Sequence, residues 1–343
     1  MEIEPLDPAA AGSSVLEGVH EVVSAADRLD KPGAPPVTFD AAIGRLENPQ
    51  PNLGRALRWV ARRDGRVAGL AALYFPDAEN SHLGLLELTV HPEARRRRIG
   101  TAVLSAITPE LRGRTVLECW NVTKGGAGVA FGTALGFEVV DETVFQTLSL
   151  VGADRCAWEV SPAAGYRLHT WHGSAPEELV TSYADARRAI ADSPFGRSAY
   201  RFPRWTADRV RESEADRRRR GIDHRVVAVV HRGSGRVVGF TELQLYPHRR
   251  DLGYQGDTAV LAAHRGRGLG FCAKAAMLRL LLAERPDVEQ VVTSTAAANP
   301  YMVNVNVALG YRTTRETVIL AQDTEKLARR RAQRSVARGW WGS

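Results

Sequence analysis

The sequence has few cysteines and no long apolar run, and each scarcity excludes a class of protein. Among the 343 residues there are only three cysteines, Cys119, Cys156 and Cys272, which are widely spaced and form no Cys-x-x-Cys pair. This excludes a disulfide framework and a structural zinc site of the usual spacing. No apolar run approaches the roughly 20 residues that a membrane helix needs. We therefore expect no membrane partner.

Several familiar motifs are also missing. Residues 1–5 lack the basic start and apolar stretch of a signal peptide, so we expect a cytoplasmic location. The nine histidines show no His-Glu-x-x-His spacing, and there is neither a Walker loop nor a Gly-x-Ser-x-Gly turn. The sequence therefore predicts no metal site.

What is present is an ordinary globular composition with a basic balance. Hydrophobic residues make up 44% and charged residues 25% of the chain, as in soluble globular proteins. The net charge of +7 suits nucleic acid, a membrane surface or a phosphate-bearing cofactor. The charge alone does not choose among these partners.

An internal repeat is the most informative feature of the chain. Three blocks recur in the same order at nearly one offset, which argues against chance. At an offset of 170 residues the aligned pairs are Gly65–Gly69 with Gly235–Gly239, Glu87 with Asp257, Arg95 with Arg265 and Gly100 with Gly270; at an offset of 174 they are Ala134–Phe137 and Ala308–Tyr311. The repeat predicts an N-terminal domain at 1–150 and a C-terminal domain at 166–322. A turn-rich linker at 151–165 separates them, and a basic tail follows at 323–343.

Each half alternates apolar, β-branched runs with helical patterns. In the second half we expect strands at 166–171, 225–231, 237–245, 258–261, 290–295 and 317–320, and helices at 176–191, 206–220, 269–283 and 301–309. The first half repeats this order. The predicted fold class is α+β, with a mixed, mostly antiparallel sheet flanked by helices in each domain.

A glycine-rich loop joins the strand ending near Val260 to the helix starting at Leu269. Glycines at 266, 268 and 270 remove side chains where a ligand must approach backbone N–H groups. Those groups lie at a helix N-terminus, which favours anions, and two flanking arginines add fork-shaped donors. This combination predicts a site for a diphosphate.

The run Arg265-x-x-Gly268-x-Gly270 resembles the coenzyme A loop of the GNAT N-acetyltransferase superfamily. The downstream block Asn299–Tyr311 resembles that superfamily's last helix and its Leu-Gly-Tyr ending. The tandem layout is distantly similar to mycothiol synthase and other two-domain GNAT acetyltransferases. The resemblance implies two tandem GNAT-like domains that use acetyl-CoA, held between two parallel strands. The cofactor-binding residues it implies are Val260, Arg265, Gly266, Arg267, Gly268, Leu269, Gly270 and Asn299, the last of which suits a helix cap equally well.

The two copies of the loop are not equal. In the first copy Arg96 and Arg98 stand where the second has Gly266 and Gly268. A long side chain there crowds a diphosphate or forces a bulky residue into positive φ. We therefore expect a weakened, non-catalytic first site, with a second working site as the alternative.

Acyl transfer needs a neutral amine, so a carboxylate near the loop is the candidate base. Asp257, on the strand leading into the loop, is our first candidate, and Glu242, on the preceding strand, is the second. The alternative for both is a structural hydrogen bond. The resembling family often carries an acidic tyrosine where this chain has Asn306, so Asn306 is the candidate donor toward the departing thiolate.

The predicted reaction moves an acetyl group from acetyl-CoA to a primary amine of a small molecule. A non-catalytic acyl-CoA-binding module or sensor is the alternative. Nucleic-acid binding through residues 95–98 and 217–220 is disfavoured, because these basic tracts lack interleaved aromatics. The acceptor and the oligomeric state are left open.

Overall fold

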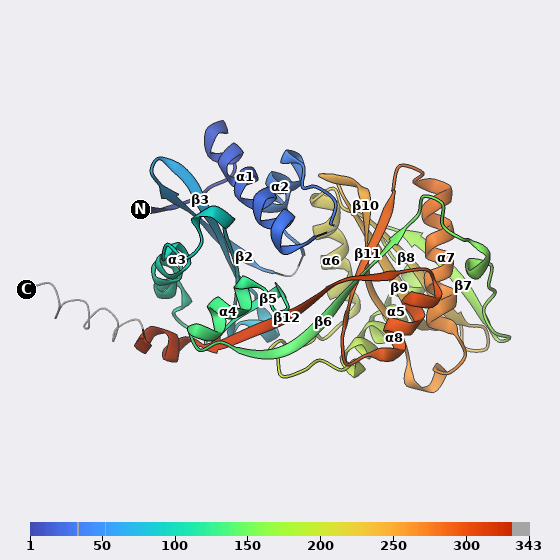
Figure 1. The fold of residues 1–343 in the computed structure, drawn as a ribbon. Coiled ribbons are helices and arrows are strands. Elements are labelled where there is room, and N and C mark those ends of the chain that lie inside the picture. Colours follow the sequence, from blue (N-terminus) through green and yellow to red (C-terminus); the bar gives the residue numbers. More distant parts are fainter. Residues whose placement is uncertain (33, 52, 331–343) are drawn as a thin grey trace, which may run out of the picture. The chain divides into compact units, whose positions relative to one another are not determined.

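The computed structural model describes residues 1–32, 34–51 and 53–330, and these form two compact units (Figure 1). Unit 1 comprises Met1–Glu142, Gly196–Arg201 and the described chain from Glu316 onward. Unit 2 comprises Thr143–Phe195 and Phe202–Arg315. The expected tail residues 331–343 lie outside the described residues.

Unit 1 is a sheet with helices on both faces. Its strands run in the order β1-β2-β3-β4-β5-β12, and of these neighbours only β4 and β5 pair in parallel. The strands are β1 (Glu2–Pro5), β2 (Arg55–Arg63), β3 (Arg66–Phe75), β4 (Leu83–Val90), β5 (Val116–Thr123) and β12 (Arg312–Asp323). The helices are α1 (Ser13–Asp30), α2 (Phe39–Glu47), α3 (Ile99–Ile107) and α4 (Ala127–Ala134), with short 3-10 turns η1 (Ala78–Asn80), η2 (Pro92–Ala94) and η3 (Thr108–Leu111).

Unit 2 repeats the plan. Its strand order is β6-β11-β10-β9-β8-β7, with β10 and β11 as the parallel pair. The strands are β6 (Glu138–Ser149), β7 (Tyr166–His172), β8 (Asp223–His231), β9 (Val237–Tyr246), β10 (Arg249–Val260) and β11 (Gln290–Ala296). The helices are α5 (Glu177–Arg188), α6 (Ala207–Arg219), α7 (Leu269–Glu284) and α8 (Pro300–Ala308), with turns η4 (Cys156–Trp158), η5 (Ala189–Asp192) and η6 (Ala262–His264). The α+β prediction, with a mostly antiparallel sheet, is confirmed.

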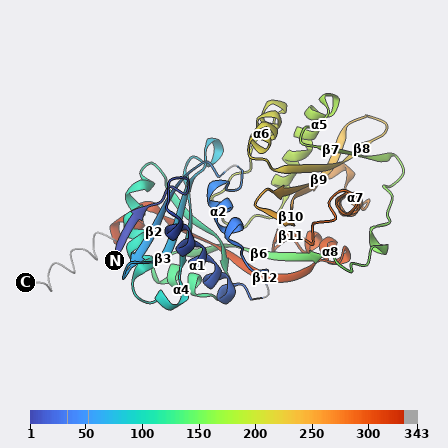
Figure 2. The ribbon, with the colours of Figure 1, turned by 90° about the horizontal axis from the view of Figure 1, so that it is seen from above.

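Two cores cover the two faces of the unit 2 sheet. On one face α5 and α6 bury Tyr183 and Val210 against Phe240, and on the other α7 buries Met277 and Leu278. Figure 2 shows these helices on opposite sides of the strands. The sheet of unit 2 is thus covered by helices on both faces.

Each unit is completed by a strand from the other half of the sequence. Residues 143–149 of β6 pair with β11 in unit 2, and residues 317–323 of β12 pair with β5 in unit 1. The units therefore differ from the continuous ranges expected at 1–150 and 166–322. The reason is that the hydrophobic pattern of a strand shows which of its faces is buried but does not identify the strand it pairs with.

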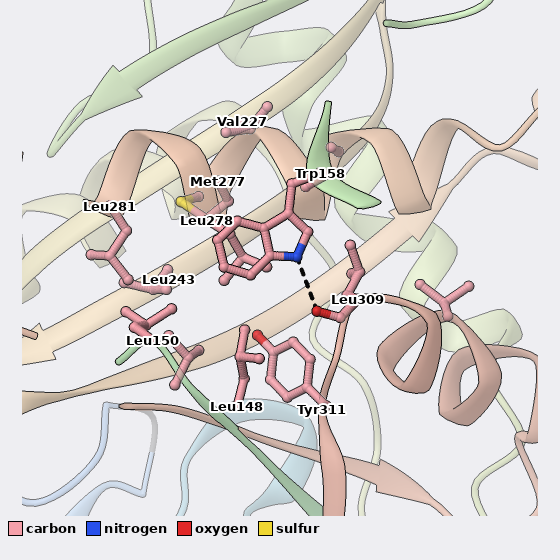
Figure 3. Close-up of a cluster of buried hydrophobic side chains, with 14 of the residues drawn as sticks. Leu148, Leu150, Trp158, Val227, Leu243, Met277, Leu278, Leu281, Leu309 and Tyr311 are labelled. Atoms are coloured by element: carbon pink, nitrogen blue, oxygen red, sulfur yellow. Dashed lines mark hydrogen bonds between the residues drawn. The ribbon is translucent and has the colours of Figure 1, made fainter. Parts of the chain in front are cut away.

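The segment expected as a linker, 151–165, packs into unit 2. Trp158 is fully buried, and its Nε1 donates to the Leu309 carbonyl at the end of α8, 3.0 Å away (Figure 3). A buried tryptophan contributes a large apolar area to the core. Residues 151–165 are therefore a turn-rich segment of the unit 2 core and not a free linker.

The start of the expected basic tail also belongs to a core. Leu327 is buried among the apolar side chains of unit 1, and the Thr324 hydroxyl donates to the Arg114 carbonyl at 2.5 Å. In the described part of the chain, no helix is long and apolar enough to cross a membrane.

Candidate active site

In both units two parallel strands pair over three residues and then separate. We call the point of separation the fork. In unit 2, β10 and β11 pair only over Leu252–Tyr254 and Gln290–Val292. In unit 1, β4 and β5 pair only over Leu83–Leu85 and 116–118. Beyond these residues the paired strands continue without pairing to each other among the described residues. In unit 2 the Thr293 hydroxyl of β11 donates to the Gln255 carbonyl of β10 at 3.2 Å, just beyond the last paired residues.

The loop after β10 holds its backbone in the left-handed region at two points. Gly266 has φ +77° and Gly268, the N-cap of α7, has φ +68°. A Cβ at either position would meet no described atom within 4 Å, so glycine relieves backbone strain here and is not needed for space within the protein. The first amides of α7 have no partner inside the helix. The loop therefore has the local features of an anion site.

The arginine side chains of this loop brace it. Arg265 donates from Nε to the Val260 carbonyl at 2.8 Å and from its terminal nitrogen to Asp192 at 2.5 Å. Arg267 donates to the Ala263 carbonyl at 3.1 Å. Of the two arginines predicted to bind the cofactor, Arg265 links the loop to the end of β10 and to Asp192, and Arg267 bonds to carbonyl groups beside it.

Two other predicted cofactor contacts have structural side-chain roles. Leu269 is 2% exposed and belongs to the unit 2 core. The Asn299 side chain accepts a hydrogen bond from the Met302 amide at 3.2 Å. Asn299 is therefore the N-cap of α8, the alternative that its place before Pro300 allowed.

Unit 1 keeps the loop's backbone without the glycines. Arg96 has φ +62° and Arg98 has φ +64°, so the bulky residues adopt the conformation that Gly266 and Gly268 adopt in unit 2. Arg95 donates to the Val90 carbonyl at 3.2 Å, as Arg265 does to Val260. The left-handed conformation costs about 1–2 kcal/mol per residue that carries a Cβ, so unit 1 retains this shape at the expense of strain.

A β-bulge places Asp257 next to the fork of unit 2. Gln255 pairs with Leu243 and Thr258 pairs with Thr241, which leaves Gly256 and Asp257 both opposite Glu242. Such a bulge redirects side chains, and bulges are frequent beside active sites. The corresponding β3·β4 ladder of unit 1 runs from Gly69 to Tyr74 without a shift.

Glu242 is a buried ion-pair partner. Arg187 donates to its two carboxylate oxygens at 2.9 and 3.2 Å, and His224 lies 2.9 Å from Oε2. Burial alone would raise the pKa of Glu242, but the charge of Arg187, the hydrogen bond from His224 and the charge of Arg217 hold it well below its usual value. A carboxylate so fully engaged is a weak base, so the geometry favours the structural alternative for Glu242.

Asp257 has the opposite character. Its side chain is 43% exposed, and its Oδ2 lies 3.5 Å from Arg187. Desolvation on its protein side, followed by the charge of Glu242, raises the pKa of Asp257 to about 6 against the opposing charges of Arg187 and Arg217. A carboxylate that titrates near neutral pH and touches solvent is suited to accept a proton. Of the two candidate bases, Asp257 has the fitting environment.

Asn306 is fully buried. Its Nδ2 donates to Gln146 Oε1 at 2.8 Å, and Thr295 Oγ1 lies 3.5 Å away. Its Oδ1 has no hydrogen-bond partner among the described residues. The donor group expected to face a thiolate is therefore engaged with a strand from the other half of the sequence, a contact that no local signal could reveal.

Sequence reasoning also missed four buried polar residues of unit 2. Arg187, Arg217 and His224 surround Glu242, and Lys274 lies in the core, where burial lowers its pKa to about 7. The only available signal was a lysine in an otherwise apolar stretch of α7. The described residues contain no group of three or more His, Cys, Asp or Glu side chains that could hold a metal ion.

In unit 1, residues 196–201 are hydrogen-bonded to β5 beside the fork. Glu118 is the last residue of β5 that pairs with β4. Its buried carboxylate accepts hydrogen bonds from the Ser198 hydroxyl at 2.9 Å and the Ala199 amide at 2.7 Å. Tyr200 packs edge-on against Trp120 at 5.3 Å between ring centroids. We call residues 196–201 the strap.

Comparison with known proteins identifies relatives across both units. The model of the acetyltransferase (GNAT) family matches residues 30–137 and 190–311. A tandem GNAT protein from the clavulanic acid biosynthesis pathway is 27% identical, with a TM-score of 0.75, over 94% of this chain and 98% of that one.

Two further solved structures share the fold. A GCN5-related N-acetyltransferase from Sphaerobacter thermophilus is 16% identical, with a TM-score of 0.68, over 94% of this chain and 95% of its own. The glucosamine N-acetyltransferase region of a fungal multi-domain β-N-acetylglucosaminidase is 16% identical, with a TM-score of 0.65, over 94% of this chain and 38% of its own. No curated protein matches the chain significantly.

Proposed function

Because the chain belongs to the acetyltransferase (GNAT) family, we propose that it transfers an acetyl group from acetyl-CoA to a primary amine of a small molecule, with the chemistry in unit 2. The observation that carries the proposal is the position of Asp257, on a bulge beside the strand fork and just before the glycine loop. The likeness to a tandem GNAT protein over nearly the whole of both chains supports it.

The residues of unit 2 fit acetyl-CoA as a co-substrate. The pyrophosphate would bind the amides of residues 266–270, where the glycines leave the backbone accessible and the helix N-terminus favours negative charge. The amide groups of the pantetheine would pair with the backbone edges that β10 and β11 leave free beyond the fork. Val260 contributes through its backbone.

The reaction needs one base and no covalent enzyme intermediate. Asp257 takes a proton from the ammonium group of the acceptor, and the neutral amine then attacks the thioester carbonyl. A C–N bond forms and the C–S bond breaks. The acylated nitrogen loses its second proton to solvent, and the departing thiolate takes a proton from solvent, so the proton held by Asp257 is the net proton released. With a pKa of about 6, Asp257 is mostly ionised at neutral pH and still close enough to neutrality to accept a proton.

Three features of unit 1 support placing the chemistry in unit 2. The β3·β4 ladder of unit 1 lacks the bulge. Glu87, the repeat partner of Asp257, forms an ion pair with Arg45 at 2.8 Å. The strap is hydrogen-bonded to Glu118 of β5 beside the fork. We infer that unit 1 has kept the architecture of the family without a bulge that presents a carboxylate beside the fork.

Acyl-CoA binding without turnover is the second candidate function. The observation that favours it is Asn306, whose amide donor is held by Gln146 and whose position lacks an acidic tyrosine. It predicts that coenzyme A binds as tightly as in an enzyme, with no thiol released in the presence of any amine.

Titration calorimetry with acetyl-CoA tests the proposal. We expect one site in the wild-type protein, lost in Gly268→Arg, which copies the loop of unit 1, and retained in the matched variant Arg98→Gly. A second site would show that the Arg98 loop binds as well. Absence of binding at millimolar ligand would overturn both candidate functions, whereas binding with no thiol release across a panel of amines would favour the second.

A further inference from the structure

The buried polar cluster beneath Asp257 contains two cations. The side chains of Arg187 and Arg217 are 3% and 4% exposed, and both approach Glu242, which is 4% exposed. His224, also buried, adds no third cation because desolvation lowers its pKa. Two guanidinium groups facing one carboxylate leave one positive charge in a low-dielectric region, which is unfavourable without a second anion.

Asp257 supplies that second anion. Its carboxylate is 3.5 Å from the Arg187 nitrogen that also donates to Glu242. The cluster is neutral when Asp257 is ionised and carries one positive charge when Asp257 is protonated. Asp257 is thus the only member of the group that combines contact with the cluster and a partly exposed side chain.

Arg187 is held rigidly enough to fix this geometry. Its guanidinium donates to the Tyr183 hydroxyl at 3.0 Å and to both oxygens of Glu242. The ring of Trp205 stacks on it, 3.7 Å from the guanidinium carbon. A planar guanidinium with two-pronged contacts on one side and an aromatic ring on its face has little freedom to reorient.

We propose that Arg187 is a positioning residue for acyl transfer, and that Arg187, Glu242 and Arg217 together set the place and the charge of Asp257. This inference rests on the proposed function. Glu242 opposes the bulge on β9, Arg187 comes from α5, and Arg217 comes from α6, so three elements converge on one carboxylate. Unit 1 has Ala72 at the position of Glu242 under the offset of 170, and there the bulge is absent as well.

The cluster also explains how the base can work repeatedly. A proton taken from the amine places a net positive charge against two arginines, which promotes its release to solvent through the exposed side of Asp257. The neutral resting cluster does not repel an incoming ammonium ion. The charged groups that face Asp257 act on it in opposite directions. Glu242 favours the protonated form of Asp257, whereas Arg187 and Arg217 favour its ionised form.

Two substitutions with opposite expected effects test the proposal. Glu242→Gln removes a negative charge, so the midpoint of Asp257 titration moves to lower pH by on the order of one unit. Arg217→Gln removes a positive charge, so the midpoint moves to higher pH. Carbon-13 NMR of the side-chain carboxyl groups measures this directly, with Asp257→Asn to assign the signal and Glu87→Gln as the matched control in unit 1.

The pH profile of kcat/KM should move with the NMR midpoint in each variant. Arg187→Lys keeps the cation and loses the two-pronged geometry, so we expect a kcat at least about tenfold lower with a smaller shift in midpoint. Unmoved midpoints in Glu242→Gln and Arg217→Gln would overturn the inference, and either variant suffices should the other fail to fold. Shifted NMR midpoints without turnover on any amine would instead count against the proposed function.

Discussion

The loops that follow β4 and β10 have the same backbone shape and different residues. Gly266 and Gly268 adopt positive φ without strain, whereas Arg96 and Arg98 are forced into it. The bracing arginines, Arg95 and Arg265, make equivalent bonds to the preceding strand. The comparison teaches that the shape of this loop is imposed by the surrounding fold, and that the residues in it decide how accessible its backbone is to a ligand.

The two forks differ in the same way. Both open after three parallel pairs. In unit 2 a bulge presents Asp257 beside the opening, whereas in unit 1 the bulge is absent and the strap is bonded to Glu118 of β5. The same strand topology therefore carries a bulge with a carboxylate beside one fork and a regular ladder beside the other.

The largest difference in kcat/KM should come from substituting the carboxylates at equivalent positions in the two forks, one at a time. Asp257→Asn should lower kcat/KM by about 100- to 10,000-fold, as for the loss of a general base, and Glu87→Gln should change it by less than about twofold. In the wild type, kcat/KM should fall as the pH drops below about 6, because only ionised Asp257 accepts a proton. Release of the CoA thiol measures both; equal losses in the two variants would contradict the assignment of the chemistry to unit 2.

Exchanging the core residues Lys274 and Leu104, which occupy equivalent positions in α7 and α3, should alter stability. Lys274→Leu removes a buried amine and should raise the free energy of unfolding by roughly 2–4 kcal/mol at neutral pH. Burial lowers the pKa of Lys274 to about 7, so the unfolded chain binds the extra proton between pH 7 and 10, and wild-type stability rises with pH over this window.

The gain from Lys274→Leu should therefore be greatest at or below pH 7 and shrink toward pH 10. Urea unfolding at pH 6.5 and pH 10 checks this, and the reverse change Leu104→Lys should destabilise unit 1. A gain that does not depend on pH would show that the amine is not desolvated in the folded protein.

The strap should matter for the stability of unit 1. Glu118→Ala leaves the Ser198 hydroxyl, the Ala199 amide and the Trp120 indole N–H without their acceptor, which should cost roughly 2–3 kcal/mol. Ser198→Ala, which removes one donor, should cost about 1 kcal/mol. Thermal unfolding measures both, and a Glu118→Ala protein as stable as wild type would show that the strap is not anchored by this carboxylate.

Exchanging the loop residues should give the smallest effect. Arg98→Gly relieves a left-handed backbone and should stabilise unit 1 by up to about 1 kcal/mol, whereas Gly268→Arg should destabilise unit 2 by about 1–2 kcal/mol. Urea unfolding distinguishes the two signs. Destabilisation by both changes would mean that Arg98 makes compensating contacts that outweigh its backbone strain.

Much of the second half of the chain could be predicted from local patterns. The apolar, β-branched run at 237–245 and the Ala- and Leu-rich run at 269–283 predicted β9 and α7 nearly to the residue. The strand β10 was expected only from 258, yet it begins at Arg249, because Gly253 and Gly256 weaken its β signal. The helices α1 and α2 of unit 1 were not identified, since the repeat carried no matching motif there.

The candidate site was predictable in part. Glycine positions pointed to the loop, and Asp257 stood out as a carboxylate leading into it. The roles of Glu242, Arg265 and Asn306 could not be read in the same way, because each depends on a partner distant in sequence: Arg187, Asp192 and Gln146. Burial changes what a polar residue can do, and burial is a property of the assembled unit.

The sequence by itself determined the repeat, the α+β class, the family and the two loops with their unequal glycine content. These follow from short-range effects: hydrophobic periodicity, helix ends and the backbone freedom of glycine. Only the tertiary structure decided that β6 and β12 complete units formed by the other half of the sequence, and that two arginines surround Glu242. Strand partners and buried ion pairs are selected by packing and charge balance among residues far apart in the chain, and no local pattern records that selection.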